Sequence, residues 1–304
     1  DAPAAVEPEA PAPETPAAPP AAAETKPERQ SSFTPPRKPA PDITDYAFAE
    51  SLGAKPQKFA APKADEDLTT GSLSRDPEAL PDTIGGSMLR LRAVQGDPSA
   101  QLEIADRLAE GRGVAPNPVA AAHWLEKAAA QGLAPAQHRL GSLYEKGRGV
   151  ARDLVVARRW YEQAAASGNV RAMHNLGVLH AEGGLGKPDF VAASVWFRMA
   201  AERGLVDSQY NLAVLQARGL AGKRDLTEAY KWFALAAAQG DQDAGRKREE
   251  VAKALGKNLA GAQQTVAGFK PRMVDSAANE APTPPGGWDQ AGAPADARNP
   301  VSLR

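Results

Sequence analysis

Apolar residues recur with a helical period through much of the chain. Between residues 98 and 110 they stand at steps of four, one and three, which places them on one face of a helix. This first set is Ala100, Ile104, Ala105 and Leu108, and it is repeated at Ala136, Leu140, Gly141 and Tyr144 and at Ala172, Leu176, Gly177 and His180. A second apolar face follows each set, in the first case with Ala121, Trp124, Leu125, Ala128 and Ala129. The pattern predicts successive pairs of amphipathic helices.

The pairs repeat every 36 residues without a break. Tryptophan occurs at Trp124, Trp160, Trp196 and Trp232, and one glycine series occurs at Gly132, Gly168, Gly204 and Gly240. A fixed period between about 20 and 50 residues is typical of stacked repeats, in which each unit buries its apolar face against its neighbours. The sequence therefore predicts an all-α fold, an α/α solenoid of helix-turn-helix repeats, with the tryptophan and glycine columns as its structural framework.

Polar residues and glycines mark the expected helix ends. Asn117, Asp153, Asp189 and Asp225 are also 36 residues apart, and each precedes a predicted second helix. Asn and Asp favour this position because the side-chain oxygen accepts a hydrogen bond from an unpaired backbone N–H. Gly111, Gly147, Gly183 and Gly219 follow the predicted first helices, where a left-handed glycine commonly ends a helix.

The period sets the domain boundaries. Four full repeats are expected at 97–132, 133–168, 169–204 and 205–240. A cap helix is expected at 82–95 and a C-terminal cap at 241–270, because the end units of an array must cover its exposed stacking faces. The whole solenoid would then span 81–272.

The two ends of the chain have a different composition. Residues 1–80 are rich in proline and alanine, and residues 273–304 return to proline, glycine and alanine. Such stretches bury too little apolar surface to offset the entropy of ordering, so we expect a disordered linker and a disordered tail. Trp288 stands out in the tail, and it either docks back on the array or a partner or remains free.

Composition narrows the function classes. The net charge of −1 gives no strong field, so we expect neither a nucleic-acid partner nor a charged membrane surface. The chain has no cysteine, which excludes disulfides and cysteine-ligated metal. No apolar run reaches the roughly 18 residues that span a bilayer. The first residue is Asp1, so we expect a processed chain or a fragment whose membrane anchor, if it has one, lies upstream.

The sequence shows no catalytic or metal-binding constellation. The four histidines are His123, His138, His174 and His180, and none forms the His-Glu-x-x-His pattern of a zinc helix. The chain also lacks the Gly-x-Ser-x-Gly turn of a nucleophile elbow. We therefore expect a protein that is not an enzyme and that uses no metal and no cofactor.

The first helices offer a surface for binding instead. Stacked helix pairs curve, and the first helices usually line the concave side. Polar residues on that side are candidates for contact with a protein partner, and they are His138, Arg139, His174, Asn175, Tyr210 and Asn211. The amides of Asn175 and Asn211 could bind the backbone of an extended peptide. The alternative is that these residues are solvated or form hydrogen bonds between repeats.

Two stretches carry a family resemblance. Residues 140–150 (LGSLYEKGRGV) and 157–168 (ARRWYEQAAASG) resemble the Sel-one-like repeat (SLR) family, which is related to the tetratricopeptide repeat. The resemblance covers about 81–255 and implies helix pairs wound into a right-handed superhelix. The loops after Gly183 and Gly219 depart from the Gly-x-Gly-Val of the first two repeats.

A wider arrangement carries a second resemblance. The proline- and alanine-rich linker, the array, residues 233–241 (FALAAAQGD), the pair at 247–248 and the closing Gly-Gly-Trp288 are similar to the periplasmic part of polar-organelle localisation factors of the PodJ type. This resemblance implies a periplasmic protein-binding scaffold with a role in cell polarity. The alternatives are a module that binds peptidoglycan or another glycan, or a periplasmic regulator of signalling.

Overall fold

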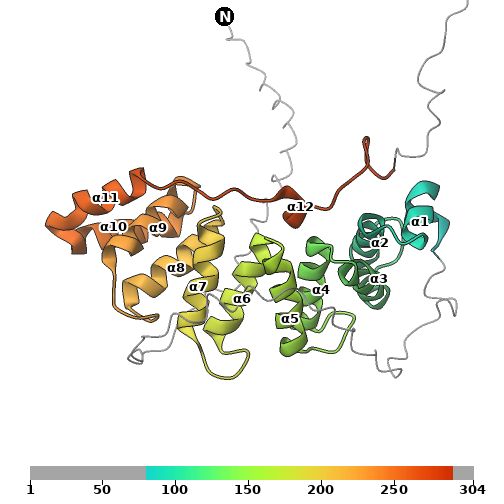
Figure 1. The fold of residues 1–304 in the computed structure, drawn as a ribbon, viewed down its shortest axis with the longest axis horizontal. Helices are drawn as coiled ribbons and strands as arrows, with labels where there is room; N and C mark the ends of the chain where they lie inside the picture. The colour runs from blue at the N-terminus through green and yellow to red at the C-terminus, as the bar shows by residue number, and fades with distance from the viewer. Residues whose placement is uncertain (1–79, 290–304) are drawn as a thin grey trace, which may run out of the picture. The chain divides into compact units, whose positions relative to one another are not determined.

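The structure is a computed structural model, and it describes residues 80–289. Of the expected linker at 1–80, residues 1–79 lie outside the described residues, and so does the end of the tail at 290–304. The described part consists of α-helices and short 3₁₀ turns, and residues 80–289 contain no strand (Figure 1).

The elements follow one another as helix pairs. They are η2 (Asp82–Ile84), α1 (Ser87–Val94), α2 (Pro98–Glu110), α3 (Pro118–Ala130), α4 (Ala134–Lys146), α5 (Leu154–Ala166), α6 (Val170–Glu182), α7 (Phe190–Ala201), α8 (Val206–Arg218), α9 (Leu226–Ala238), α10 (Gln242–Leu255), η3 (Gly256–Asn258), α11 (Leu259–Ala267) and α12 (Ser276–Asn279). Each helix from α1 to α9 packs against the next one, which is the arrangement of an α/α solenoid, and α11 packs against α9.

The predicted helix ends are confirmed. The side chains of Asn117, Asp153, Asp189 and Asp225 accept backbone N–H groups at the starts of α3, α5, α7 and α9. The first helices of the four repeats end at Gly111, Gly147, Gly183 and Gly219, with φ angles of 76°, 65°, 72° and 66°. These values lie in the left-handed region, where a residue with a Cβ is strained.

The core follows the repeat columns. The side chains of Trp124, Trp160, Trp196 and Trp232 are all buried, and so are the small residues Ala100, Ala136, Ala172, Ser208 and Ala244. The small residues let neighbouring helices approach, and the indoles fill the space that remains. This division of roles explains why both columns keep the same period.

A buried glutamine column joins one repeat to the next. Gln101, Gln137 and Gln209 occupy the same position of the 36-residue repeat. Each donates its side-chain N–H to a backbone carbonyl eight residues earlier, on Ala93, Ala129 and Ala201 respectively. Each amide therefore ties the start of a first helix to the end of the preceding second helix. The third repeat has Met173 in this position, and it is equally buried.

The N-terminal cap differs from the single helix expected at 82–95. The segment forms η2 and then α1, separated by Gly85 and Gly86. Gly85 has a φ angle of 151°, which is outside the helical region, and two adjacent glycines are poor helix formers. The Arg90 guanidinium stabilises the break, since it donates to the carbonyl oxygens of Asp82 and Gly85.

The expectation of a disordered tail from residue 273 is wrong as far as residue 289. After α11, residues 269–289, here called the C-terminal segment, run back beside the array from α9 to α1 and α2 (Figure 1). Trp288 is only 6% exposed and belongs to the buried cluster that includes Ile84. Of the two alternatives for Trp288, the structure shows docking on the array. No helix in residues 80–289 is long and apolar enough to cross a membrane.

Candidate functional site

The predicted binding residues occupy two neighbouring columns on the first helices. His138, His174 and Tyr210 form one column, on α4, α6 and α8. Their ring centroids lie 5.7, 5.6 and 5.5 Å from those of Tyr161, Phe197 and Phe233 on the paired second helices. These rings therefore pack between the two helices of their own repeats, and the residues are buried or half-buried.

Burial keeps the two histidines of this column neutral. It lowers the pKa of His138 to about 4, with further contributions from the positive charges of Arg171 and Lys146 and from His174. Burial also lowers the pKa of His174, although Asp207 opposes the shift. His174 Nδ1 lies 2.8 Å from the hydroxyl oxygen of Ser208 in the next repeat, so this ring joins two repeats by a hydrogen bond.

The second column is more exposed. It consists of Glu103, Arg139, Asn175 and Asn211, each one residue after the ring column. The Arg139 side chain is 44% exposed and forms an ion pair with Asp106 of the preceding repeat. Asn175 and Asn211 are half-buried.

Asn175 lies near a buried tyrosine of the preceding repeat. The Tyr161 hydroxyl donates a 2.6 Å hydrogen bond to Glu145, and the Asn175 side chain is near enough to lower the pKa of this hydroxyl. Burial, together with the negative charge of Glu145, raises the pKa of Tyr161, so that the hydroxyl stays protonated. Asn175 on α6 therefore lies near the Tyr161 hydroxyl of the preceding repeat, and as a half-buried residue it retains some surface for a ligand.

The described residues hold no cluster of three or more His, Asp or Glu side chains that could bind a metal ion. The chemistry that the two columns can supply consists of amide and guanidinium hydrogen bonds to a peptide, beside the edges of aromatic rings. Arg139, Asn175 and Asn211 have the exposure that such contacts require, whereas the ring column serves mainly to join the helices.

A second set of contacts was not predicted. Residues of the C-terminal segment bond to Arg107, to Glu202 and to the turn at 168–170, none of which belongs to the two columns. One signal could have found them. Arg107 stands in a column with Leu143, Leu179 and Leu215, and Glu202 stands in a column with Val94, Ala130, Ala166 and Ala238. Leu179 and Leu215 are buried, so a charged residue at the Arg107 position of this column indicates a contact that the other repeats lack.

Comparison with protein families identifies the repeats. The Sel1 repeat family matches residues 98–133, 134–169, 170–205 and 206–241. These matches have the length and phase of the helix pairs α2–α3, α4–α5, α6–α7 and α8–α9. Residues 98–241 are therefore four Sel1 repeats, and proteins with such repeats generally mediate interactions between proteins.

Solved structures support the same assignment. A protective antigen of uropathogenic Escherichia coli strains that displays an SLR fold is 32% identical, with a TM-score of 0.54 over 59% of this chain and 40% of its own. A Sel1 repeat protein from Oxalobacter formigenes is 33% identical, with a TM-score of 0.50 over 54% of this chain and 47% of its own. The chain thus spans less than half the length of either. A comparison with curated proteins gave no match.

Proposed function

We propose that the array is a non-catalytic scaffold that binds an extended segment of another protein along its first helices. The observation that carries this proposal is the partly exposed polar column, in which Arg139, Asn175 and Asn211 recur at the 36-residue period. Regular spacing of amides and a guanidinium suits a peptide backbone, whose donors and acceptors are also regularly spaced. The family membership of residues 98–241 supports a protein partner.

We further propose that the chain works in a bacterial periplasm, as part of a polar localisation factor. The support is the resemblance of the linker, the array and the closing Gly-Gly-Trp288 to such factors. A fluorescent fusion expressed in a bacterium that has a periplasm tests this point. A focus at one pole is expected, and an even signal around the envelope would contradict the polar role.

The binding face is tested by changing Asn175 and Asn211 together to alanine. A partner is first identified by crosslinking the full chain in cells, and its affinity for the purified chain is then measured. We expect the double variant to bind at least about ten-fold more weakly, since each lost amide removes on the order of 1 kcal/mol. Asn258→Ala is the matched control, because Asn258 is an exposed asparagine in η3, outside the column. Equal loss in both proteins, or no loss in either, would reject this face.

The wild-type chain and the double variant also distinguish a protein ligand from a glycan ligand. Purified sacculi are incubated with the full chain and with the double variant, and the bound fraction is measured. We expect no binding to sacculi. Binding of the wild-type chain that the double variant loses would assign the column to peptidoglycan instead.

A further inference from the structure

The C-terminal segment is held at three separate places along the array. Near α7, the Arg272 N–H donates a 2.7 Å hydrogen bond to the carbonyl oxygen of Glu202, and the two side chains form an ion pair of 2.8 Å. Before these contacts, the ring of Phe269 packs edge-on against Trp232 at 5.4 Å between centroids. The segment therefore begins its return at α9 and passes α7 next.

The middle contact is made at the turn between α5 and α6. Asn169 Nδ2 donates a 2.7 Å hydrogen bond to the carbonyl oxygen of Ala278, while Asn169 Oδ1 caps α6 by accepting from Ala172. Asn279 forms two more hydrogen bonds to this turn. Its Oδ1 accepts from the Val170 N–H at 2.8 Å, and its Nδ2 donates to the carbonyl oxygen of Gly168. Ala278 is buried, so this stretch of α12 is packed as well as bonded.

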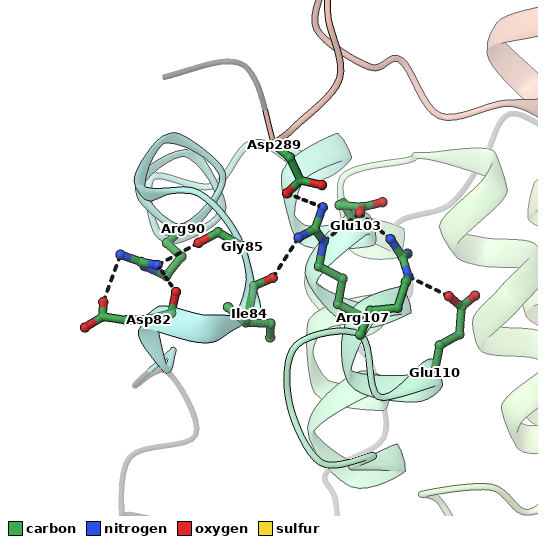
Figure 2. Close-up of polar contacts among 9 residues, drawn as sticks. Asp82, Ile84, Gly85, Arg90, Glu103, Arg107, Glu110 and Asp289 are labelled. Carbon is green, nitrogen blue, oxygen red and sulfur yellow. Dashed lines mark hydrogen bonds and ion pairs between the residues drawn. The ribbon is translucent and has the colours of Figure 1, made fainter. Parts of the chain in front are cut away.

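The third contact lies at the N-terminal end of the array and is shown in Figure 2. The Asp289 carboxylate forms a 2.8 Å ion pair with the guanidinium of Arg107, which also bonds to Glu103 and to the carbonyl oxygen of Ile84. A Cβ on Gly85 would come within 2.7 Å of this guanidinium, so the glycine makes room for it. Trp288 is buried beside Gly86, whose own Cβ position lies 3.5 Å from the Trp288 carbonyl oxygen.

All three places depart from the repeat pattern in a way that fits the segment. Arg107 replaces the leucine of its column, and Glu202 replaces an alanine or valine. Asn169 stands in a column with Asp97, Leu133, Leu205 and Asp241. An aspartate can cap a helix but cannot donate, so only the asparagine both caps α6 and bonds to Ala278. At the buried Arg107 position, a repeat that needed only to stack would keep the leucine of its column.

We propose that the edge of the array that carries Arg107, Asn169 and Glu202 is a peptide-binding site, and that residues 272–289 are its built-in ligand. The ligand class is an extended peptide that presents an arginine, an asparagine and a Trp-Asp pair in that order. None of Arg107, Asn169 and Glu202 belongs to the column of Arg139, Asn175 and Asn211, so the two proposed sites consist of different residues. A partner that carries the same three features competes with the chain's own segment.

The test uses full-length variants and a fluorescein-labelled peptide of residues 269–289. The open variant carries Arg272→Ala, Asn279→Ala, Trp288→Ala and Asp289→Ala, which removes the side-chain contacts of the tethered ligand and leaves the residues of the array unchanged. A tethered segment has an effective concentration in the millimolar range, so the wild-type site is already filled. We expect the labelled peptide to bind the open variant at least about ten-fold more tightly than the wild-type chain.

A matched control restores the repeat pattern on the array. Arg107→Leu, Asn169→Asp and Glu202→Ala each introduce a residue that the same column holds elsewhere, at Leu179, Asp97 and Ala166. Added to the open variant, these changes should weaken peptide binding at least about ten-fold, because the ion pairs and the amide donor are lost. Equal binding to the wild-type chain and the open variant, or undiminished binding after the pattern is restored, would overturn the proposal.

Hydrogen exchange gives a readout that needs no added peptide. In the wild-type chain, the amides of Arg272 and Gly287 should be protected, since both donate backbone hydrogen bonds. With the three array changes alone, protection should fall across 272–289 and stay the same in α4–α9. Unchanged protection in the segment would contradict the site. A dimer whose protection falls on dilution would show that the segment comes from a second copy, and would overturn the assignment within one chain.

Discussion

Gly141 on α4 lies directly against the ring of Tyr161 on α5. A Cβ at Gly141 would come within 2.7 Å of the Cδ1 and Cε1 atoms of that ring, and within 3.2 Å of the Ala157 carbonyl oxygen. Gly177 stands in the same relation to Phe197 in the next repeat, at 2.6 Å. The large ring and the absent side chain are therefore complementary, and they set how closely the two helices of a repeat approach.

Gly141→Ala should destabilise the array despite the better helix propensity of alanine. The methyl group must displace a buried ring, and such overpacking costs about 1–3 kcal/mol. Gly245→Ala in α10 is the control, because the nearest atom to its added Cβ is 3.9 Å away. There the gain in propensity should raise stability by up to about 1 kcal/mol. Urea denaturation followed by circular dichroism measures both, and equal effects in the two variants would contradict the packing argument.

Trp160→Ala should cost about 3–5 kcal/mol of unfolding free energy, since it empties a site in the buried tryptophan column. The Trp160 side chain is 6% exposed. Val155→Ala on the same helix changes a residue that is 47% exposed and should alter stability by less than about 1 kcal/mol. A nearly unchanged unfolding free energy of Trp160→Ala would contradict the conclusion that the tryptophan column stabilises the stacked repeats.

His138 should make the array less stable as the pH falls. In the unfolded chain its pKa is near 6.5, whereas burial holds it at about 4 in the folded chain. Below pH 6.5 the unfolded state therefore binds a proton that the folded state does not, and this favours unfolding. The contribution is fully present above pH 6.5 and is lost as the pH falls toward 4. Because the ring is half-buried, we expect a loss of about 1–3 kcal/mol.

The His138 effect is isolated by comparison with His138→Tyr, which places the residue of Tyr210 in the same column. Unfolding free energies of the two proteins are measured from pH 7.5 to pH 4. The variant should lose less stability over this range, because its ring takes up no proton there. Parallel curves for the two proteins would assign the acid sensitivity to other groups.

Gln137 should be more tolerant of methionine than of alanine. Its amide donates to the Ala129 carbonyl oxygen, which also accepts from the Gly132 N–H, so loss of the amide leaves that oxygen bonded. Gln137→Met keeps the volume and follows the example of Met173, and it should cost about 1 kcal/mol. Gln137→Ala adds a cavity and should cost about 1–3 kcal/mol more. Equal costs, measured by denaturation, would show that the hydrogen bond and not the volume dominates.

Much of the array could be predicted because its information is local and is repeated four times. The cap at Asp153, the left-handed Gly147 and the buried Trp160 each follow from a short stretch of chain, and each recurs at the same phase in other repeats. Repetition averages out the weakness of any one signal, so the helix pairs and their boundaries follow from the period.

The contacts of the C-terminal segment could not be predicted in this way. Asn169 and Ala278 are 109 residues apart, and their hydrogen bond occurs once, so no period marks it. Proline and alanine give residues 273–289 the composition of a solvated tail. The different roles of His138 and Arg139 could not be predicted either. A helical pattern does not show which of two neighbouring residues packs against an aromatic ring of the paired helix and which is exposed to solvent.

The return of the chain to its first repeat has a mechanical consequence. A tension applied at Asp289 is carried first by the ion pair with Arg107 and by the buried Trp288, both at the N-terminal end of the array. In a solenoid whose last helix carried the load, the repeats would peel away from that end one at a time. Here α11 and α9 bear no load until the contacts at Arg107, Asn169 and Glu202 have broken in turn. The segment therefore protects the C-terminal repeats from unfolding under tension.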